Sequence, residues 1–119
     1  MLQLAIGLVL LAFIGGVVQA VVSPKRKTVG RGGWLYFISN GPETPVKVGL
    51  SKYDPTKQRL GELQTMSPTP LRVIYKLPVR DRFAAETMVH AHLAPYRKNG
   101  AWFDRDATLA FIEHMKGSY

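Results

Sequence analysis

The stretch from residue 46 to residue 64 constrains the fold most, because its hydrophobic pattern changes from the period of a strand to that of a helix. Residues 46–51 read Val-Lys-Val-Gly-Leu-Ser, an alternation that is typical of a half-buried strand. Asp54 can cap a following helix, and Pro55 suits its first position, where a missing N–H costs no hydrogen bond. Residues 58–64 then place two leucines on one side of an amphipathic helix. The stretch therefore predicts a strand–turn–helix unit.

Further strands and helices are predicted on both sides of this unit. Aromatic and branched residues predict a strand at 34–39, which an Asn-Gly-Pro turn connects to the strand that follows. A third strand is predicted at 71–77, where Pro78 would end it. Helices are predicted over residues 81–93 and after Asp104, which can cap the second of them. The order β-β-α-β-α-α predicts an α+β fold, with a three-stranded antiparallel sheet flanked by helices.

The helix predicted over residues 81–93 has apolar side chains that could face the core. The packing candidates are Phe83, Ala84, Met88 and Ala91.

Charged residues are confined to the part of the chain after the first 22 residues. No Lys, Arg, Asp or Glu precedes Lys25, and a helix over residues 4–22 would be about 28 Å long, close to the hydrocarbon thickness of about 30 Å. The basic cluster that follows predicts a single-pass membrane protein with its N-terminus outside and its C-terminal domain in the cytoplasm. A signal peptide cleaved after Ala20 is the alternative, which the uncharged first residues and the basic cluster disfavour.

This pattern divides the chain into three parts. Residues 1–22 are the predicted transmembrane anchor, 23–32 a basic linker that contains glycines, and 33–116 the folded domain. Small residues recur in the anchor at intervals of four, which could pair two anchor helices into an oligomer; they are Ala12, Gly16 and Ala20.

The charge balance indicates an anionic partner. The chain of 119 residues carries a formal net charge of +8, which favours nucleic acid or a lipid surface. It has no cysteine, so disulfides and thiolate metal sites are excluded. Basic residues of the predicted domain form a candidate DNA-contact surface or a solvated face; they are Lys47, Lys52, Lys57, Arg59, Arg97 and Lys98.

Several short motifs together resemble the GIY-YIG nuclease superfamily. In chain order they are Gly33-Trp34-Leu35-Tyr36, Lys47-Val48-Gly49, Arg59, Glu86 with His90, and Trp102-Phe103. The sequence is most similar to the small phage and bacterial DNA-binding branch of that superfamily, named after an open reading frame of a T-odd phage. The resemblance extends from about Gly33 to Met115, which is nearly all of the predicted domain.

The resemblance implies hydrolysis of DNA phosphodiesters with one divalent metal ion, Mg²⁺ or Mn²⁺, and no small-molecule cofactor. It implies that Tyr36 activates or orients the attacking water and that Arg59 stabilises charge on the phosphoryl oxygens. Glu86 takes the position of the metal-binding carboxylate, which offsets charge on the leaving oxygen. His90 lies four residues after Glu86, so both side chains can point into one cleft as catalytic residues.

The chain departs from the nuclease pattern at two positions. Lys47 stands where the second motif has a tyrosine, and Asn99 is the one downstream candidate for the late asparagine of the family. These departures keep two alternatives to a membrane-anchored endonuclease open. One is a nuclease-derived DNA binder without catalysis, and the other is a membrane adaptor that binds anionic lipid or a protein. The deciding geometry is whether Tyr36, Arg59 and Glu86 converge.

Overall fold

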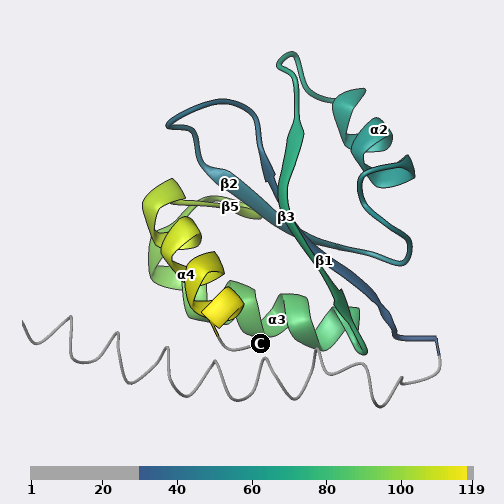
Figure 1. The fold of residues 1–119 in the computed structure, drawn as a ribbon. Coiled ribbons are helices and arrows are strands. Elements are labelled where there is room, and N and C mark those ends of the chain that lie inside the picture. The colour runs from purple at the N-terminus through teal and green to yellow at the C-terminus, as the bar shows by residue number, and fades with distance from the viewer. Residues whose placement is uncertain (1–29, 118–119) are drawn as a thin grey trace, which may run out of the picture.

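The computed structural model describes residues 30–117, which form a five-stranded antiparallel sheet and three α-helices (Figure 1). The sheet order is β3-β1-β2-β5-β4. The elements are β1 (Gly33–Ser39), β2 (Val46–Ser51), α2 (Gln58–Gln64), β3 (Arg72–Val79), α3 (Arg82–Leu93), the 3₁₀-helix η1 (Ala94–Tyr96), β4 (Arg97–Asn99), β5 (Trp102–Phe103) and α4 (Arg105–Gly117).

The two faces of the central strands have different environments. Leu35 and Phe37 of β1 are fully buried with Val46 and Val48 of β2, because alternate side chains of a strand point to the same face. Helices α3 and α4 cover this face, and α2 lies on the other side of the sheet (Figure 1). Full burial of each such side chain contributes about 1.5–3 kcal/mol to stability. The helix residues buried in the core are Ala85, Val89, Leu93, Phe111, Ile112 and Met115.

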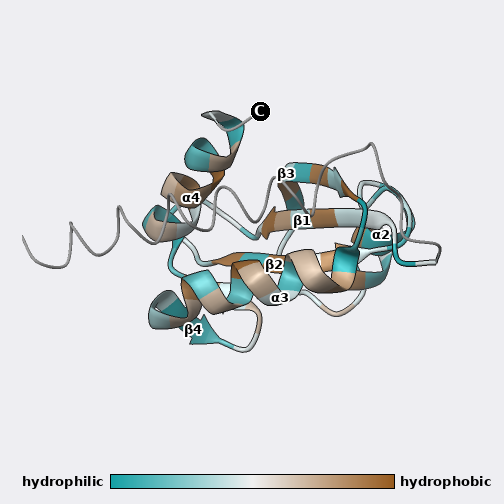
Figure 2. Cartoon of the chain, turned by 90° about the horizontal axis from the view of Figure 1, so that it is seen from below, coloured by the Kyte–Doolittle hydropathy of each residue, from teal (hydrophilic) through white to brown (hydrophobic). Residues whose placement is uncertain are grey.

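Helix α3 runs alongside β2 when the molecule is seen from below (Figure 2). Its start is set by Asp81, whose Oδ1 accepts a hydrogen bond from the backbone N–H of Ala84 at 3.0 Å. Helix α4 begins in the same way, because Asp104 accepts from the backbone N–H of Ala107 at 3.0 Å. The predicted starts of both helices are therefore confirmed.

The predicted start of α2 is wrong. The helix begins at Gln58, and Lys57 at its N-cap makes no side-chain capping bond. The Asp54 carboxylate instead accepts from the backbone N–H and the hydroxyl of Thr56, and from Nζ of Lys76 at 2.7 Å. A local aspartate turn has thus replaced the helical cap, as short polar side chains often do.

The sheet has five strands, so the predicted three-stranded sheet is wrong. Strands β4 and β5 form a short hairpin that joins the sheet through pairing of β5 with Val46 and Lys47 of β2. Strands of three and two residues are too short to show a hydrophobic period, which is why this region read as a loop. Pro78 lies inside β3 instead of ending it, because β3 is an edge strand and an edge tolerates a missing N–H.

The predicted single-pass membrane localisation also needs correction. Of the helices within residues 30–117, none has the length and apolar character needed to cross a membrane. The segment in which we predicted the anchor, residues 1–22, lies outside the described residues. The described residues form an α+β domain, and none of their helices could span a membrane.

Candidate active site

Tyr36 lies in the middle of the sheet, where its ring crosses over a glycine of the neighbouring strand. Tyr36 of β1 pairs with Gly49 of β2, and only 4% of Tyr36 is exposed. A Cβ atom added at Gly49 would overlap the Cζ and Oη atoms of the tyrosine. The glycine of the second motif therefore makes the space in which the tyrosine of the first motif lies.

Three charged side chains influence the pKa of the Tyr36 hydroxyl. Burial raises the pKa of Tyr36, the positive charge of Arg59 acts to lower that pKa, and the negative charges of Glu86 and Glu62 raise it. These charges come from α2 and α3, on different sides of the sheet. The structure thus brings Tyr36, Arg59 and Glu86 into one electrostatic environment. A raised pKa also means that the phenol keeps its proton at neutral pH.

Arg59 is oriented by a partner on its own helix. Its Nη1 donates to Oε2 of Glu62 at 3.1 Å, three residues further along α2. Its Nε is enclosed and has no hydrogen-bond partner among the described residues. An enclosed donor without an acceptor is costly, by about 1–3 kcal/mol. A ligand oxygen would instead reach the outer N–H groups of Arg59, whose side chain is 37% exposed.

Glu86 and His90 lie one turn apart on α3 but have different surroundings. The His90 Nε2 lies 2.9 Å from the Val48 carbonyl oxygen, and because a carbonyl only accepts, this nitrogen is the donor. The ring also packs edge-on against Phe103 at 5.0 Å. Glu86 is partly exposed and makes no hydrogen bond or ion pair within the described part of the chain. His90 therefore attaches α3 to β2, while the Glu86 carboxylate stays available to a ligand.

The donor atoms near Glu86 fit only a loosely held metal ion. Within residues 30–117, no three His, Asp or Glu side chains are grouped so that they could hold a metal ion. A zinc site, which needs three or four protein ligands, does not fit this arrangement. Mg²⁺ keeps several waters and is commonly bound through one or two carboxylates and the phosphate of a substrate. A hydrated Mg²⁺ or Mn²⁺ ion shared between Glu86 and a phosphate does fit.

A small cavity lies next to Arg59, between the end of β2 and the start of α2. Its volume is about 190 Å³, and it is lined by Ser51, Lys52, Tyr53, Gln58, Arg59 and Glu62. We call it the Arg59 cavity. Tyr36 and Glu86 are not among its lining residues, so the cavity contains neither the hydroxyl nor the carboxylate.

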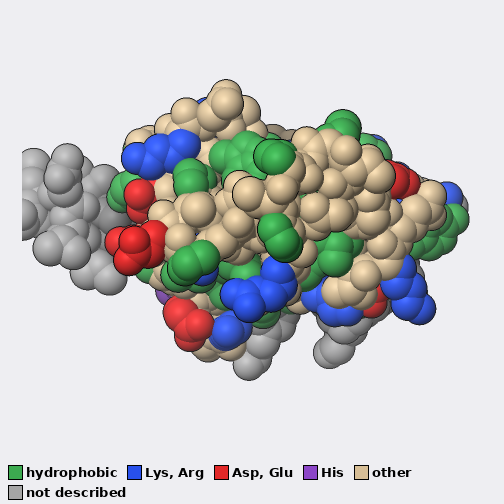
Figure 3. Space-filling view, turned by 90° about the horizontal axis from the view of Figure 1, so that it is seen from above, with side chains coloured by type: hydrophobic (Ala, Val, Ile, Leu, Met, Phe, Trp, Pro, Cys, Tyr) green, Lys and Arg blue, Asp and Glu red, His purple; other side chains and the backbone are tan. Residues whose placement is uncertain are grey.

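The predicted DNA-contact residues are divided between the two ends of β2. Lys52 and Lys57 are exposed near the Arg59 cavity, at the end of the strand. Lys47 lies near the start of the strand, with its Nζ 5.8 Å from the centre of the Trp102 ring. Figure 3 shows Lys and Arg side chains in several separate groups on the face that it presents. On that face, the positive charge is not one continuous patch.

Arg97 and Lys98 belong to the hairpin at the other end of β2. The guanidinium of Arg97 lies 4.9 Å from the centre of the Phe103 ring, and its Nη1 donates to the Gly100 carbonyl. The Nζ of Lys98 lies 3.9 Å from Oδ1 of Asp104. Lys98 is thus exposed but weakly paired, and Arg97 partly serves to hold the hairpin.

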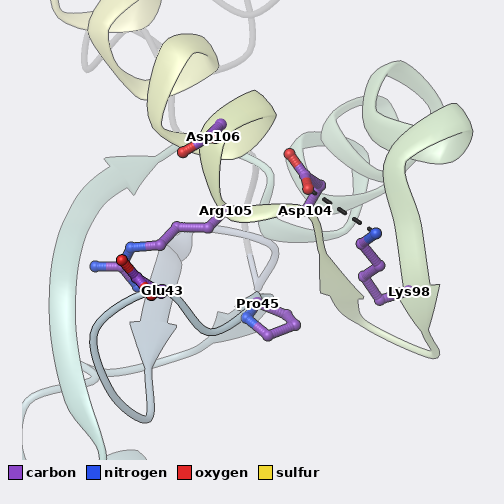
Figure 4. Close-up of a pocket in the computed structure, with 6 residues that line it drawn as sticks. All are labelled: Glu43, Pro45, Lys98, Asp104, Arg105 and Asp106. Atoms are coloured by element: carbon purple, nitrogen blue, oxygen red, sulfur yellow. Dashed lines mark ion pairs between the residues drawn. The ribbon is translucent and has the colours of Figure 1, made fainter.

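A larger cavity, of about 510 Å³, lies beside this hairpin at the start of α4 (Figure 4). Arg105 crosses from α4 to the β1–β2 loop, where its Nη1 donates to Oγ of Ser39 at 2.9 Å and to the Gly41 carbonyl at 3.0 Å. Its role there is to hold the loop. Its lining has three carboxylates and two cations, which makes this cavity a poorer anion site than the smaller one. Its lining residues are Glu43, Pro45, Lys98, Asp104, Arg105 and Asp106.

Sequence reasoning missed three residues near Arg59. Glu62 acts on both Arg59 and Tyr36, and its position three residues after Arg59 on a predicted helix could have revealed it. Tyr53 and Gln58 line the Arg59 cavity, but no spacing in the sequence distinguishes a loop residue that faces a cavity.

Comparison with known proteins identifies the family. A protein-family model, that of the T5orf172 domain, matches residues 33–115. This domain is found in open reading frames of phages and is associated with nucleases of the GIY-YIG and HNH kinds. No curated protein and no solved structure matches the chain. The matched range covers most of the chain and includes Tyr36, Arg59 and Glu86, and the chain therefore belongs to the T5orf172 domain family.

Proposed function

We propose that this protein is a nuclease-like DNA-binding domain that hydrolyses phosphodiesters at the site formed by Tyr36, Arg59 and Glu86. One observation carries the proposal: charged side chains of α2 and α3 both act on the hydroxyl of Tyr36 in β1. The family match supports DNA as the substrate, because the T5orf172 domain is associated with nucleases. The excess of 16 Lys and Arg over 8 Asp and Glu supports a polyanionic ligand.

Arg59 would bind the phosphate that is attacked. Its guanidinium stays charged at every relevant pH and presents several N–H donors in one plane, which suits phosphate oxygens. Glu62 orients the side chain through Nη1, and 37% of the side chain is exposed, so its outer N–H groups can reach a ligand. A phosphate oxygen would accept from these exposed N–H groups and at the same time place the phosphorus near Tyr36.

Tyr36 would position the attacking water and would not remove its proton. The phenol keeps its own proton at neutral pH because its pKa is raised, so it acts as a hydrogen-bond donor. Its hydroxyl has no hydrogen-bond partner within the described residues, and it is not among their enclosed side-chain atoms without one. A water or a phosphoryl oxygen can therefore reach the hydroxyl.

Glu86 would hold the divalent cation, and Lys47 would add positive charge to the same face of the sheet as Tyr36. When bound, Mg²⁺ or Mn²⁺ would stabilise negative charge on the phosphate oxygens. Lys47 and Gly49 are two residues apart in β2, so their Cα–Cβ directions point to the face on which the Tyr36 ring lies. A lysine there can contact phosphate as a point charge.

The test is cleavage of supercoiled plasmid by the full chain in the presence of Mg²⁺ or Mn²⁺. We expect Glu86→Gln to lower the rate of nicking about 100-fold or more, a typical effect of removing one group that stabilises transition-state charge. DNA affinity measured without metal should change less than about threefold, because Glu86 is an anion and does not attract phosphate. Glu113→Gln is the matched control, because Glu113 is an exposed carboxylate on α4. Nicking that survives Glu86→Gln would contradict the assignment.

A DNA binder without catalysis is the second candidate. Lys47 replaces the tyrosine of the second motif, and a protonated Tyr36 is no general base, so both observations favour it. Salt-dependent binding of DNA by the wild-type chain, without cleavage in either metal, would select this candidate.

A further inference from the structure

Tyr53 is a large exposed side chain at the edge of the proposed phosphate site. It lies in the loop between β2 and α2, and 64% of it is exposed. It lines the Arg59 cavity together with Arg59 itself. The mechanism above gives this ring no role.

The backbone that carries Tyr53 is held at several points. The Ser51 hydroxyl donates to the Tyr53 carbonyl oxygen at 2.7 Å. The next residue, Asp54, accepts from Thr56 and from Lys76 of β3, and Pro55 is fully buried. The loop therefore presents the Tyr53 ring to solvent from a fixed position, which lowers the entropy cost of stacking a ligand on it.

The remaining lining of the cavity has the chemistry of a nucleotide site. The Nζ of Lys52 lies 5.7 Å from the centre of the Tyr53 ring, where it can meet a phosphate beside a stacked base. Gln58 has a side-chain amide that makes no hydrogen bond within the described residues, and amides can pair with the edge of a base. The cavity, at about 190 Å³, is below the range of about 300–1,000 Å³ for drug-sized ligands, which suits one base and not several.

We propose that the Arg59 cavity receives one unpaired base, stacked on Tyr53, from the DNA strand whose phosphate lies at Arg59. This inference rests on the proposed function and narrows its substrate class. Bases of a continuous duplex are stacked on their neighbours and cannot reach Tyr53 unless they are extruded. The preferred substrate is therefore DNA with unpaired nucleotides next to the phosphate at Arg59, such as an overhang or a bubble.

The test measures binding of the full chain to two labelled DNAs by fluorescence anisotropy, without metal. One DNA is a continuous duplex, and the other is the same duplex with a central mismatched bubble. We expect the wild type to bind the bubble about tenfold more tightly than the duplex, within the range reported for stacking of one base on an aromatic ring. Tyr53→Ala should lose this preference and keep its duplex affinity within about twofold, and Tyr53→Trp should retain the preference. Tyr96→Ala is the control, because Tyr96 is also an exposed tyrosine, at 49%, but lies in η1.

Two results would overturn the inference alone: a wild type that binds both DNAs equally, or a Tyr53→Ala variant that keeps the preference while it still binds duplex. A wild type that binds neither DNA would overturn the proposed function and this inference together. Thermal unfolding of each variant shows whether the fold is intact, and Gln58→Ala gives a second measurement. We expect Gln58→Ala to weaken bubble binding and leave duplex binding unchanged.

Discussion

Glycines of the two strand motifs shape the site at the scale of single residues. Tyr36 occupies the space that a side chain at position 49 would need. Gly33 has a similar function at the start of β1, where a Cβ atom would overlap the Ser51 carbonyl oxygen. Both glycines thus allow close contact between β1 and β2: Gly49 with the Tyr36 ring, and Gly33 with the Ser51 carbonyl oxygen. The position of the Tyr36 hydroxyl depends on this approach.

We expect Gly49→Ala to destabilise the protein, because the new methyl group would force the buried Tyr36 ring to move. Overpacking of this kind costs about 1–3 kcal/mol, and in a domain of this size about 1 kcal/mol lowers the Tm by roughly 4–8 °C. Thermal unfolding followed by circular dichroism measures the change. Gly61→Ala is the control, since Gly61 lies in α2 with open space around its Cβ position. It should leave the Tm unchanged or raise it. Equal changes for both variants would contradict the packing described.

At the scale of elements, α3 and α4 meet at a half-buried histidine. The His92 ring of α3 lies 4.7 Å from the Phe111 ring of α4, measured between centroids. Burial lowers the pKa of His92, and the positive charge of His114 lowers it further. Protonation of His92 therefore opposes the packing of the two helices.

We expect the stability of the fold to decline as the pH falls below about 6.5. The folded pKa of His92 lies below the ordinary value of 6.5, so the unfolded chain binds this proton more readily. Asp54 and Asp81 do not contribute in this range, because hydrogen bonds from Lys76 and Arg31 lower their pKa values. Unfolding by urea between pH 5 and pH 7.5 measures the dependence. His92→Gln should flatten it, and a variant with the wild-type slope would refute the role of His92.

The elements predictable from sequence are those long enough to show a period. The periods predicted β1 and β2 closely, and the two acidic caps predicted the starts of α3 and α4. Strands β4 and β5 carry no period, and they take their conformation from pairing with β2, which lies far away in the chain.

The packing face of α3 was predicted only in part, because Met88 packs against the core but Phe83 does not. Phe83 was expected in the core, but it is 41% exposed. The guanidinium groups of Arg31 and Arg82 lie 4.9 Å and 4.4 Å from the centre of its ring, so cations cover it in place of the sheet. Contacts between distant segments decide such a case, and the apolar pattern of one helix does not contain them.

The candidate site shows the same limit. Tyr36, Arg59 and Glu86 were selected by resemblance to a family, and no periodicity in the chain links them. Glu62 could have been found from its position three residues after Arg59, whereas the role of Tyr53 depends on the β2–α2 loop, which Asp54 holds to Lys76 of β3.

The molecule as a whole places basic residues at both ends of β2. Lys57 and the Arg59 cavity lie at one end of the strand, and Lys98 lies in the hairpin at the other end. A strand of six residues extends for about 17 Å, which corresponds to about five base pairs of DNA. A DNA backbone that follows β2 would therefore meet both groups at once. On the face seen in Figure 3, Lys and Arg side chains form separate groups.

We expect Lys57→Ala and Lys98→Ala each to reduce the salt dependence of duplex binding by about one phosphate contact. The slope of log Kd against log[NaCl] should fall by about 0.9 in each single variant and by about twice that in the double variant. Lys116→Ala is the control, because Lys116 is also exposed but lies on α4, across the sheet from α2. Its slope should match that of the wild type. A reduced slope for Lys57→Ala alone would confine the contact to the end of β2 near Arg59. Unchanged slopes for both variants would mean that DNA does not follow this strand.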